Sequence, residues 1–134
     1  MRGLVDLWVE TADLSPGEQQ TTIRRMLPGR AAELNISIWK PGDSIPKQGT
    51  RILVGVSEWN PGDLQFLDWL IGNTVDARIE IFLLADCKSQ EDIDCHIPGI
   101  ARVFQPPVVG VWRDGILVAR EQSVPAATKL FAKR

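Results

Sequence analysis

The most reactive side chains in this sequence are two cysteines and a histidine that lie near one another. Cys87 and Cys95 are eight positions apart, and His96 follows Cys95 directly. Enzymes that exchange disulfides typically hold their two thiols in a Cys-x-x-Cys motif. The wider spacing leaves two interpretations, ordinary reduced cysteines or a pair that forms a regulatory disulfide. A catalytic Cys–His pair is disfavoured because adjacent residues point apart on a helix.

A single histidine also makes a Ser–His–Asp triad or a histidine-based metal centre hard to build. We therefore expect no metal and no cofactor.

A second segment of interest is residues 59–63, which read Trp-Asn-Pro-Gly-Asp. Asn60 and Pro61 are typical of a helix start, and Asp63 lies near the positive end of the helix dipole. The segment is either a helix cap alone or a polar binding site at a helix end.

Composition limits the class of protein that these residues serve. The 134 residues, of 14.9 kDa, predict one domain spanning residues 1–134. With 15 Lys and Arg against 17 Asp and Glu, the chain lacks the basic character of nucleic-acid binders. No apolar run approaches the ~20 residues of a membrane span. Because the sequence opens without a signal-peptide pattern and has few cysteines, we expect a cytoplasmic protein.

The elements that position these residues follow from local patterns. Ser15, Pro16 and Glu18 form a capping box at a helix start, and Pro28-Gly29 predicts the end of that helix. Asn60 and Ser89 are expected to cap two more helices, the second ending at Asp92, and residues 123–133 form the last one. Apolar or alternating runs predict strands at residues 4–10, 35–39, 51–56, 77–84, 108–112 and 116–119.

The order of these elements predicts an α/β fold. Strands alternate with helices, and an Asp114-Gly115 turn then closes a hairpin. The near-continuous apolar run at residues 51–56 indicates a central strand covered on both faces. Residues 40–50 are rich in proline and glycine and are expected to form an irregular loop. The chain should therefore form an α/β sandwich with a mixed central sheet and helices on both faces.

In its second half the chain resembles the thioredoxin superfamily. Residues 51–59, Arg-Ile-Leu-Val-Gly-Val-Ser-Glu-Trp, are similar to the strand that leads into the family's Trp-Cys-Gly-Pro-Cys motif. Residues 105–108, Gln-Pro-Pro-Val, resemble the loop before the family's cis-proline, with Pro107 as the match. Residues 108–119 resemble its closing hairpin. The resemblance implies a thioredoxin-like three-layer sandwich and a cis bond between Pro106 and Pro107, although residues 1–50 match by element order alone.

The functional prediction follows from the absence of the family's two redox cysteines at residues 60 and 63. Asn60 and Asp63 stand where the resemblance places the two redox cysteines, and neither side chain can attack or resolve a disulfide. Superfamily members without these cysteines include assembly chaperones. The thioredoxin-like proteins of hydrogenase expression are an example, similar to this chain in architecture only. The resemblance therefore implies a non-catalytic module that binds another protein.

The binding residues expected from the resemblance are Trp59, Asn60, Asp63, Gln105, Pro106 and Pro107. Trp59 would be the aromatic anchor, and its replacement by alanine should weaken binding by about 2 kcal/mol. Two other functions stay open at this point. One is a thiol oxidoreductase or redox sensor that uses Cys87 and Cys95. The other is an immunity-type or mobile-element protein that binds one partner.

Overall fold

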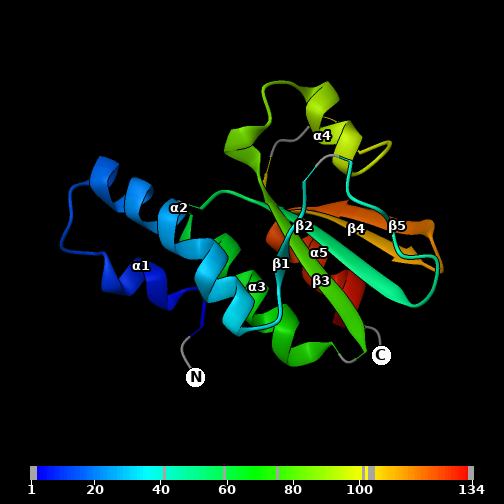
Figure 1. Cartoon of the computed structure of the whole chain (residues 1–134), viewed down its shortest axis with the longest axis horizontal. Coiled ribbons are helices and arrows are strands. Elements are labelled where there is room, and N and C mark those ends of the chain that lie inside the picture. The colour runs from blue at the N-terminus through cyan, green and yellow to red at the C-terminus, as the bar shows by residue number, and fades with distance from the viewer. Residues whose placement is uncertain are drawn as a thin grey trace.

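The computed structural model of the chain describes residues 3–40, 42–58, 60–74, 76–100, 102 and 105–132. It is an α/β structure in which helices pack around a five-stranded mixed sheet (Figure 1). The helices are α1 (Asp6–Glu10), α2 (Pro16–Glu33), α3 (Pro61–Asn73), α4 (Gln90–His96) and α5 (Val124–Ala132), with a short 3-10 helix η1 (Leu84–Asp86). The strands are β1 (Ser37–Ile38), β2 (Thr50–Val56), β3 (Ala77–Leu83), β4 (Val108–Arg113) and β5 (Ile116–Gln122).

Strand β2 lies at the centre of the sheet, whose strand order is β1-β3-β2-β4-β5. Strands β1 and β2 both run parallel to β3, whereas β4 is antiparallel to β2 and to β5. Six consecutive residues of β2, from position 51 to 56, are buried. This confirms the prediction of a central strand, since a strand covered on both faces reads as a continuous apolar run.

Alternate residues of β2 contribute to two apolar clusters on the two faces of the sheet. Ile52, Val54 and Val56 join the larger cluster, which includes buried residues of α2, α3 and α5. Leu53 joins the smaller cluster, together with Ile97 just after α4. Because side chains along a strand point alternately to opposite faces, β2 contributes to an apolar cluster on each face of the sheet. The predicted α/β class with a mixed sheet is confirmed.

The predicted strand at residues 4–10 is wrong, because this segment forms helix α1. Leu4 and Leu7 are both fully buried, and a separation of three residues suits one face of a helix. The Asp68 carboxylate of α3 accepts hydrogen bonds from the backbone N–H groups of Leu4 at 2.7 Å and Val5 at 3.0 Å. These bonds satisfy amides that a helix start leaves free, so a distant residue supports the helical conformation.

Helix α2 begins as predicted but does not end at Pro28-Gly29. The Ser15 hydroxyl accepts a hydrogen bond from the Glu18 N–H at 3.4 Å, which confirms the cap. The helix then continues through Pro28 to Glu33, although proline removes one hydrogen bond of the helix. Burial of an apolar face in the core offsets this loss. The buried apolar residues of α2 lie four positions apart: Ile23, Leu27 and Ala31.

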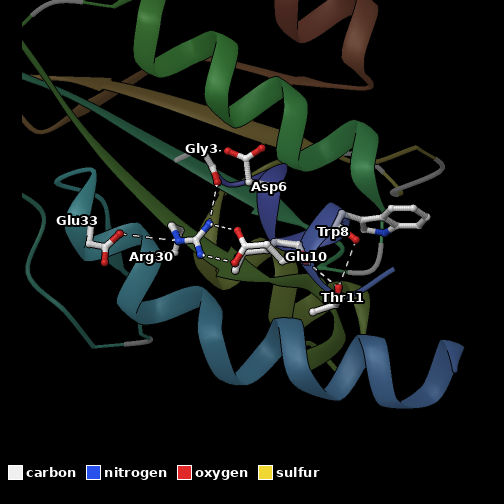
Figure 2. Close-up of polar contacts among 8 residues, drawn as sticks. Gly3, Asp6, Trp8, Glu10, Thr11, Arg30 and Glu33 are labelled. Carbon is white, nitrogen blue, oxygen red and sulfur yellow. Dashed lines mark hydrogen bonds and ion pairs between the residues drawn. The ribbon is translucent and has the colours of Figure 1, made fainter. Parts of the chain in front are cut away.

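An ion pair between the buried Arg30 and the partly exposed Glu10 connects α1 to α2 (Figure 2). The Arg30 side chain is only 3% exposed, and two of its nitrogens lie 3.1 Å from the two carboxylate oxygens of Glu10. The same guanidinium donates to the Gly3 carbonyl at 3.2 Å and lies 3.8 Å from a Glu33 oxygen. The hydrogen bond to Glu10 raises the pKa of Arg30. Arg30 of α2 thus contacts both α1 and the residues before it.

The remaining elements agree closely with their patterns. Asn60 caps α3 and Ser89 caps α4, although α4 extends beyond the predicted end. Strand β1 is shorter than the predicted strand at residues 35–39. At the β4–β5 turn, Asp114 and Gly115 have φ values of 52° and 84°, which the tight hairpin turn requires. The bond between Pro106 and Pro107 is cis, as expected.

Among the described residues, no helix is both long and apolar enough to span a bilayer.

Candidate functional site

Two carboxyl groups are buried where β2 leads into α3, one in the connecting loop and one in the first turn of the helix. Glu58 and Asp63 are both fully buried. Asp63 Oδ2 accepts a hydrogen bond from the Ser57 N–H at 2.8 Å, whereas no described residue donates to Oδ1. Burial raises the pKa of Asp63 to about 6, although the bond from Ser57 opposes this change. Asp63 thus fastens the loop to the helix start and offers no charge at the surface.

Arg24 of α2 connects this loop to the end of β3. Its guanidinium lies 3.4 Å from the buried Glu58 carboxylate and also contacts Asp86 of η1. No described residue hydrogen-bonds the second oxygen of Glu58. The loops that follow parallel strands β2 and β3 therefore meet beside α2. The carboxyl ends of parallel strands are where open α/β sheets commonly form ligand crevices.

A groove of about 280 Å³ lies beside the start of α3. Its lining residues come from three segments of the chain: Asn60, Gln105, Pro106, Val124 and Pro125. The segments converge because Gly55 of β2 pairs with Val108 of β4, which places the residues after β2 next to the residues before β4. The structure thus brings together three of the predicted binding residues, Asn60, Gln105 and Pro106.

Of the other predicted binding residues, Asp63 and Pro107 do not line this groove. Asp63 and Pro107 are buried. Trp59 lies outside the described residues. The carbonyls of Gln105 and Pro107 both accept hydrogen bonds from the Ser123 N–H at 3.0 Å, and these bonds attach the loop to the start of α5. Ordering of the proline loop is therefore the role that Pro107 has in the structure.

Val124 and Pro125 are groove residues that sequence reasoning missed. Both lie in the first turn of α5, and Val124 is 38% exposed. Their signal in the sequence is weak, since a valine and a proline at a helix start are ordinary. Only the packing of α5 next to the proline loop shows that they form one wall of the groove.

The groove combines an apolar wall with amide groups, and none of its described lining residues is ionisable. The Asn60 side-chain oxygen caps α3 by accepting from the Gly62 N–H at 3.0 Å, so its NH2 group is left to donate to a ligand. Gln105 is exposed, and its side chain can both donate and accept. Pro106 has no N–H and can offer only its carbonyl. These groups suit an uncharged polypeptide backbone better than an anion or a metal ion.

The two cysteines lie apart from this groove, around α4. Both are free thiols, with Cys95 exposed and Cys87 half-buried. Burial raises the pKa of Cys87 to about 11, and the carboxylates of Asp92 and Asp86 add to the effect. A thiol that ionises so rarely is a poor nucleophile. The neighbouring His96 ring uses Nδ1 to contact the Asp92 carbonyl at 2.7 Å.

The part of the chain that the structure describes contains no group of three or more side chains placed to hold a metal ion. Comparisons of the sequence with protein-family models and with curated proteins find no match. Function is therefore inferred from the geometry and chemistry of the groove.

Proposed function

We propose that this chain is a redox-inactive, thioredoxin-like module that binds an extended segment of another protein in the groove beside α3. The proposal depends on one observation, the convergence of Asn60, Gln105 and Pro106 on a single uncharged groove. Polar amides beside an apolar wall are typical of surfaces that recognise peptides, because they pair with the backbone while apolar side chains pack. The mixed sheet and the sequence motifs are consistent with a thioredoxin-like architecture.

The absence of redox activity is the second part of the proposal. Asn60 is engaged as a helix cap and Asp63 is buried, so neither supplies a nucleophile at the helix start. With a dithiol donor, the protein should not reduce insulin faster than the donor alone. Turnover comparable to that of a thioredoxin would contradict this part of the proposal.

The alternative functions receive less support. A thiol oxidoreductase or sensor would need a reactive thiolate, and the raised pKa of Cys87 opposes this. An immunity-type or mobile-element protein would also bind one partner, and no observation favours it over an assembly chaperone. Mass spectrometry after mild oxidation tests the redox alternative, since pairing of Cys87 with Cys95 removes two hydrogens.

Protein binding is tested by capture of partners from the native cell, followed by calorimetry with the purified partner. Gln105→Trp should obstruct the groove and weaken affinity by about tenfold or more, the loss of about 1.4 kcal/mol. The matched control is Gln48→Trp, because Gln48 is exposed in the loop before β2. Equal affinities for the two variants would contradict the proposal.

Trp59→Ala examines the proposed aromatic anchor in the same assay. We expect a loss of about 2 kcal/mol in binding and a much smaller change in the free energy of unfolding. A core tryptophan would instead cost about 3–5 kcal/mol of stability. Lost stability with unchanged affinity of the folded protein would remove Trp59 from the proposed site.

A further inference from the structure

A buried arginine on the central strand lies between two tryptophan rings. Arg51, the second residue of β2, is 1% exposed, and its Cζ atom lies 4.1 Å from the centroid of the Trp39 ring and 4.5 Å from that of the Trp112 ring. Trp112 of β4 pairs with Arg51 in the sheet. Trp39 follows β1, and its backbone N–H donates to the Ile81 carbonyl of β3 at 2.8 Å. The two indoles therefore reach Arg51 from opposite sides of β2.

The Arg51 guanidinium and the Trp39 indole have hydrogen-bond donors without acceptors. Arg51 Nε donates to the Glu80 carboxylate. No described residue accepts from Nη1 or Nη2 of Arg51, or from Nε1 of Trp39, and all three nitrogens are shielded from solvent. The rings cover the faces of the guanidinium, but its N–H groups donate in its own plane and still need acceptors there. Because a buried unpaired donor costs free energy, this cluster favours an acceptor from outside the chain.

The charges around Arg51 favour an anion as that acceptor. Glu80 is 2% exposed, and its second carboxylate oxygen lies 3.8 Å from a guanidinium nitrogen of the largely exposed Arg78. Two positive guanidinium groups therefore share one negative carboxylate, which leaves one positive charge in excess. A monovalent anion balances this charge, and it accepts a stronger hydrogen bond from a guanidinium than water does.

We propose that Arg51 and Trp39 bind a small monovalent inorganic anion, such as chloride. Glu80 occupies the Nε side of the guanidinium, which leaves the Nη nitrogens of Arg51 and the indole Nε1 of Trp39 to hold the ion. A divalent anion such as sulfate is disfavoured, because burial of a larger charge costs more hydration free energy.

The proposed anion site is independent of the groove beside α3, since neither Arg51 nor Trp39 lines that groove. Trp39 begins the connection between β1 and β2. An anion shared by Trp39 and Arg51 would therefore attach this connection to the central strand.

The direct test is an NMR titration of the ¹⁵N-labelled protein with sodium chloride, in which sodium gluconate keeps the ionic strength constant. The Trp39 indole signal, assigned by its loss in Trp39→Phe, should shift and reach saturation together with the Arg51 Nε–H signal. Sodium bromide should reproduce these shifts, and sodium sulfate should not. If chloride causes no saturable shift, or if sulfate causes the same shift, the inference is wrong.

Two matched variants test the residues that hold the ion. Trp39→Phe keeps an aromatic ring for Arg51 but removes the unpaired indole N–H, so it should weaken chloride binding about tenfold in a titration followed by the ³⁵Cl line width. Trp112→Phe is the control, because it changes the other stacked ring but removes a nitrogen that is not among the buried unpaired atoms. It should bind chloride nearly as the wild type does. Equal chloride affinities for the two variants would overturn the inference.

Arg51→Lys should abolish chloride binding, because lysine keeps a positive charge beside Glu80 but lacks the two Nη nitrogens. Circular dichroism and urea unfolding establish which variants are folded. A folded Arg51→Lys that binds chloride as tightly as the wild type would contradict the inference. If Arg51→Lys does not fold, the comparison of Trp39→Phe with Trp112→Phe decides the result.

Discussion

Replacement of Asp63 by asparagine should alter how stability depends on pH. The carboxyl group is fully buried, and burial raises its pKa from an ordinary value of 3.8 to about 6. Because the folded protein holds this proton more tightly than the unfolded chain, protonation favours the folded state. The stability that Asp63 contributes is thus fully present below pH 3.8 and is lost as the pH rises through 6.

The size of the effect follows from the two pKa values. Each pKa unit corresponds to about 1.36 kcal/mol, so the difference between 3.8 and about 6 amounts to about 3 kcal/mol. Asparagine keeps an oxygen that can accept from the Ser57 N–H and cannot ionise. Its buried NH2 group adds a cost that does not vary with pH. A comparison of variant and wild type across pH therefore isolates the ionisation of Asp63.

Urea unfolding at several pH values provides the measurement. The free energy of unfolding of Asp63→Asn, minus that of the wild type, should rise by about 3 kcal/mol from below pH 3.8 to above pH 6. Asp13→Asn is the matched control, because Asp13 is exposed and remains hydrated in the folded protein. The corresponding difference for the control should stay nearly flat.

If the free energy of unfolding of Asp63→Asn, minus that of the wild type, does not change with pH, this prediction is refuted. It would mean that Asp63 ionises in the folded protein as it does in the unfolded chain, so that burial does not disfavour its charge. A difference that falls with pH would show instead that the ionised carboxylate is stabilised, and the start of α3 would then be a site that favours negative charge.

Three further predictions concern packing and thiol reactivity. Arg30→Met removes the buried guanidinium that bonds to the Glu10 carboxylate and to the Gly3 carbonyl, and should lower the free energy of unfolding by about 2 kcal/mol. A loss under about 1 kcal/mol in urea unfolding would contradict this ion-pair role. Gly55→Ala would make Cβ overlap with the Phe82 ring on β3, so thermal unfolding should report a loss of about 1–3 kcal/mol, and unchanged stability would be inconsistent with that contact. In mildly alkaline buffer, iodoacetamide should modify Cys95 at least about tenfold faster than Cys87, and equal rates by mass spectrometry would argue against the raised pKa of Cys87.

The parts of the fold that were predictable are those governed by neighbours in sequence. Asn60 caps a helix by bonding to an amide two residues away, and Ser15 does so three residues away. Asp114-Gly115 closes a hairpin through its own backbone angles. The central position of β2 follows from its uninterrupted apolar run, which only burial on both faces tolerates.

The two wrong predictions, a strand at residues 4–10 and a helix end at Pro28-Gly29, concern segments whose local sequence pattern permits two structures. Leu4 and Leu7 suit a helix face or an apolar strand, and the carboxylate of Asp68, more than sixty residues away, caps the helix. Pro28 usually ends a helix, but burial of one face of α2 in the core outweighs one missing hydrogen bond. In both cases contacts between distant segments decided the outcome, and no local pattern specifies those contacts.

The sequence alone determined which residues could form a binding site, because the motifs around Asn60 and Gln105 are local. Only the tertiary structure decided which of them share a groove. Pairing of Gly55 with Val108 brings the segments that contain Asn60 and Gln105 together, and the packing of α5 adds Val124. The stack of Arg51 between two indoles was beyond sequence reasoning, since it joins β2, β4 and the segment after β1. The physical reason is the same throughout: capping and turns depend on nearby atoms, whereas a groove or a buried cluster depends on long-range packing between elements.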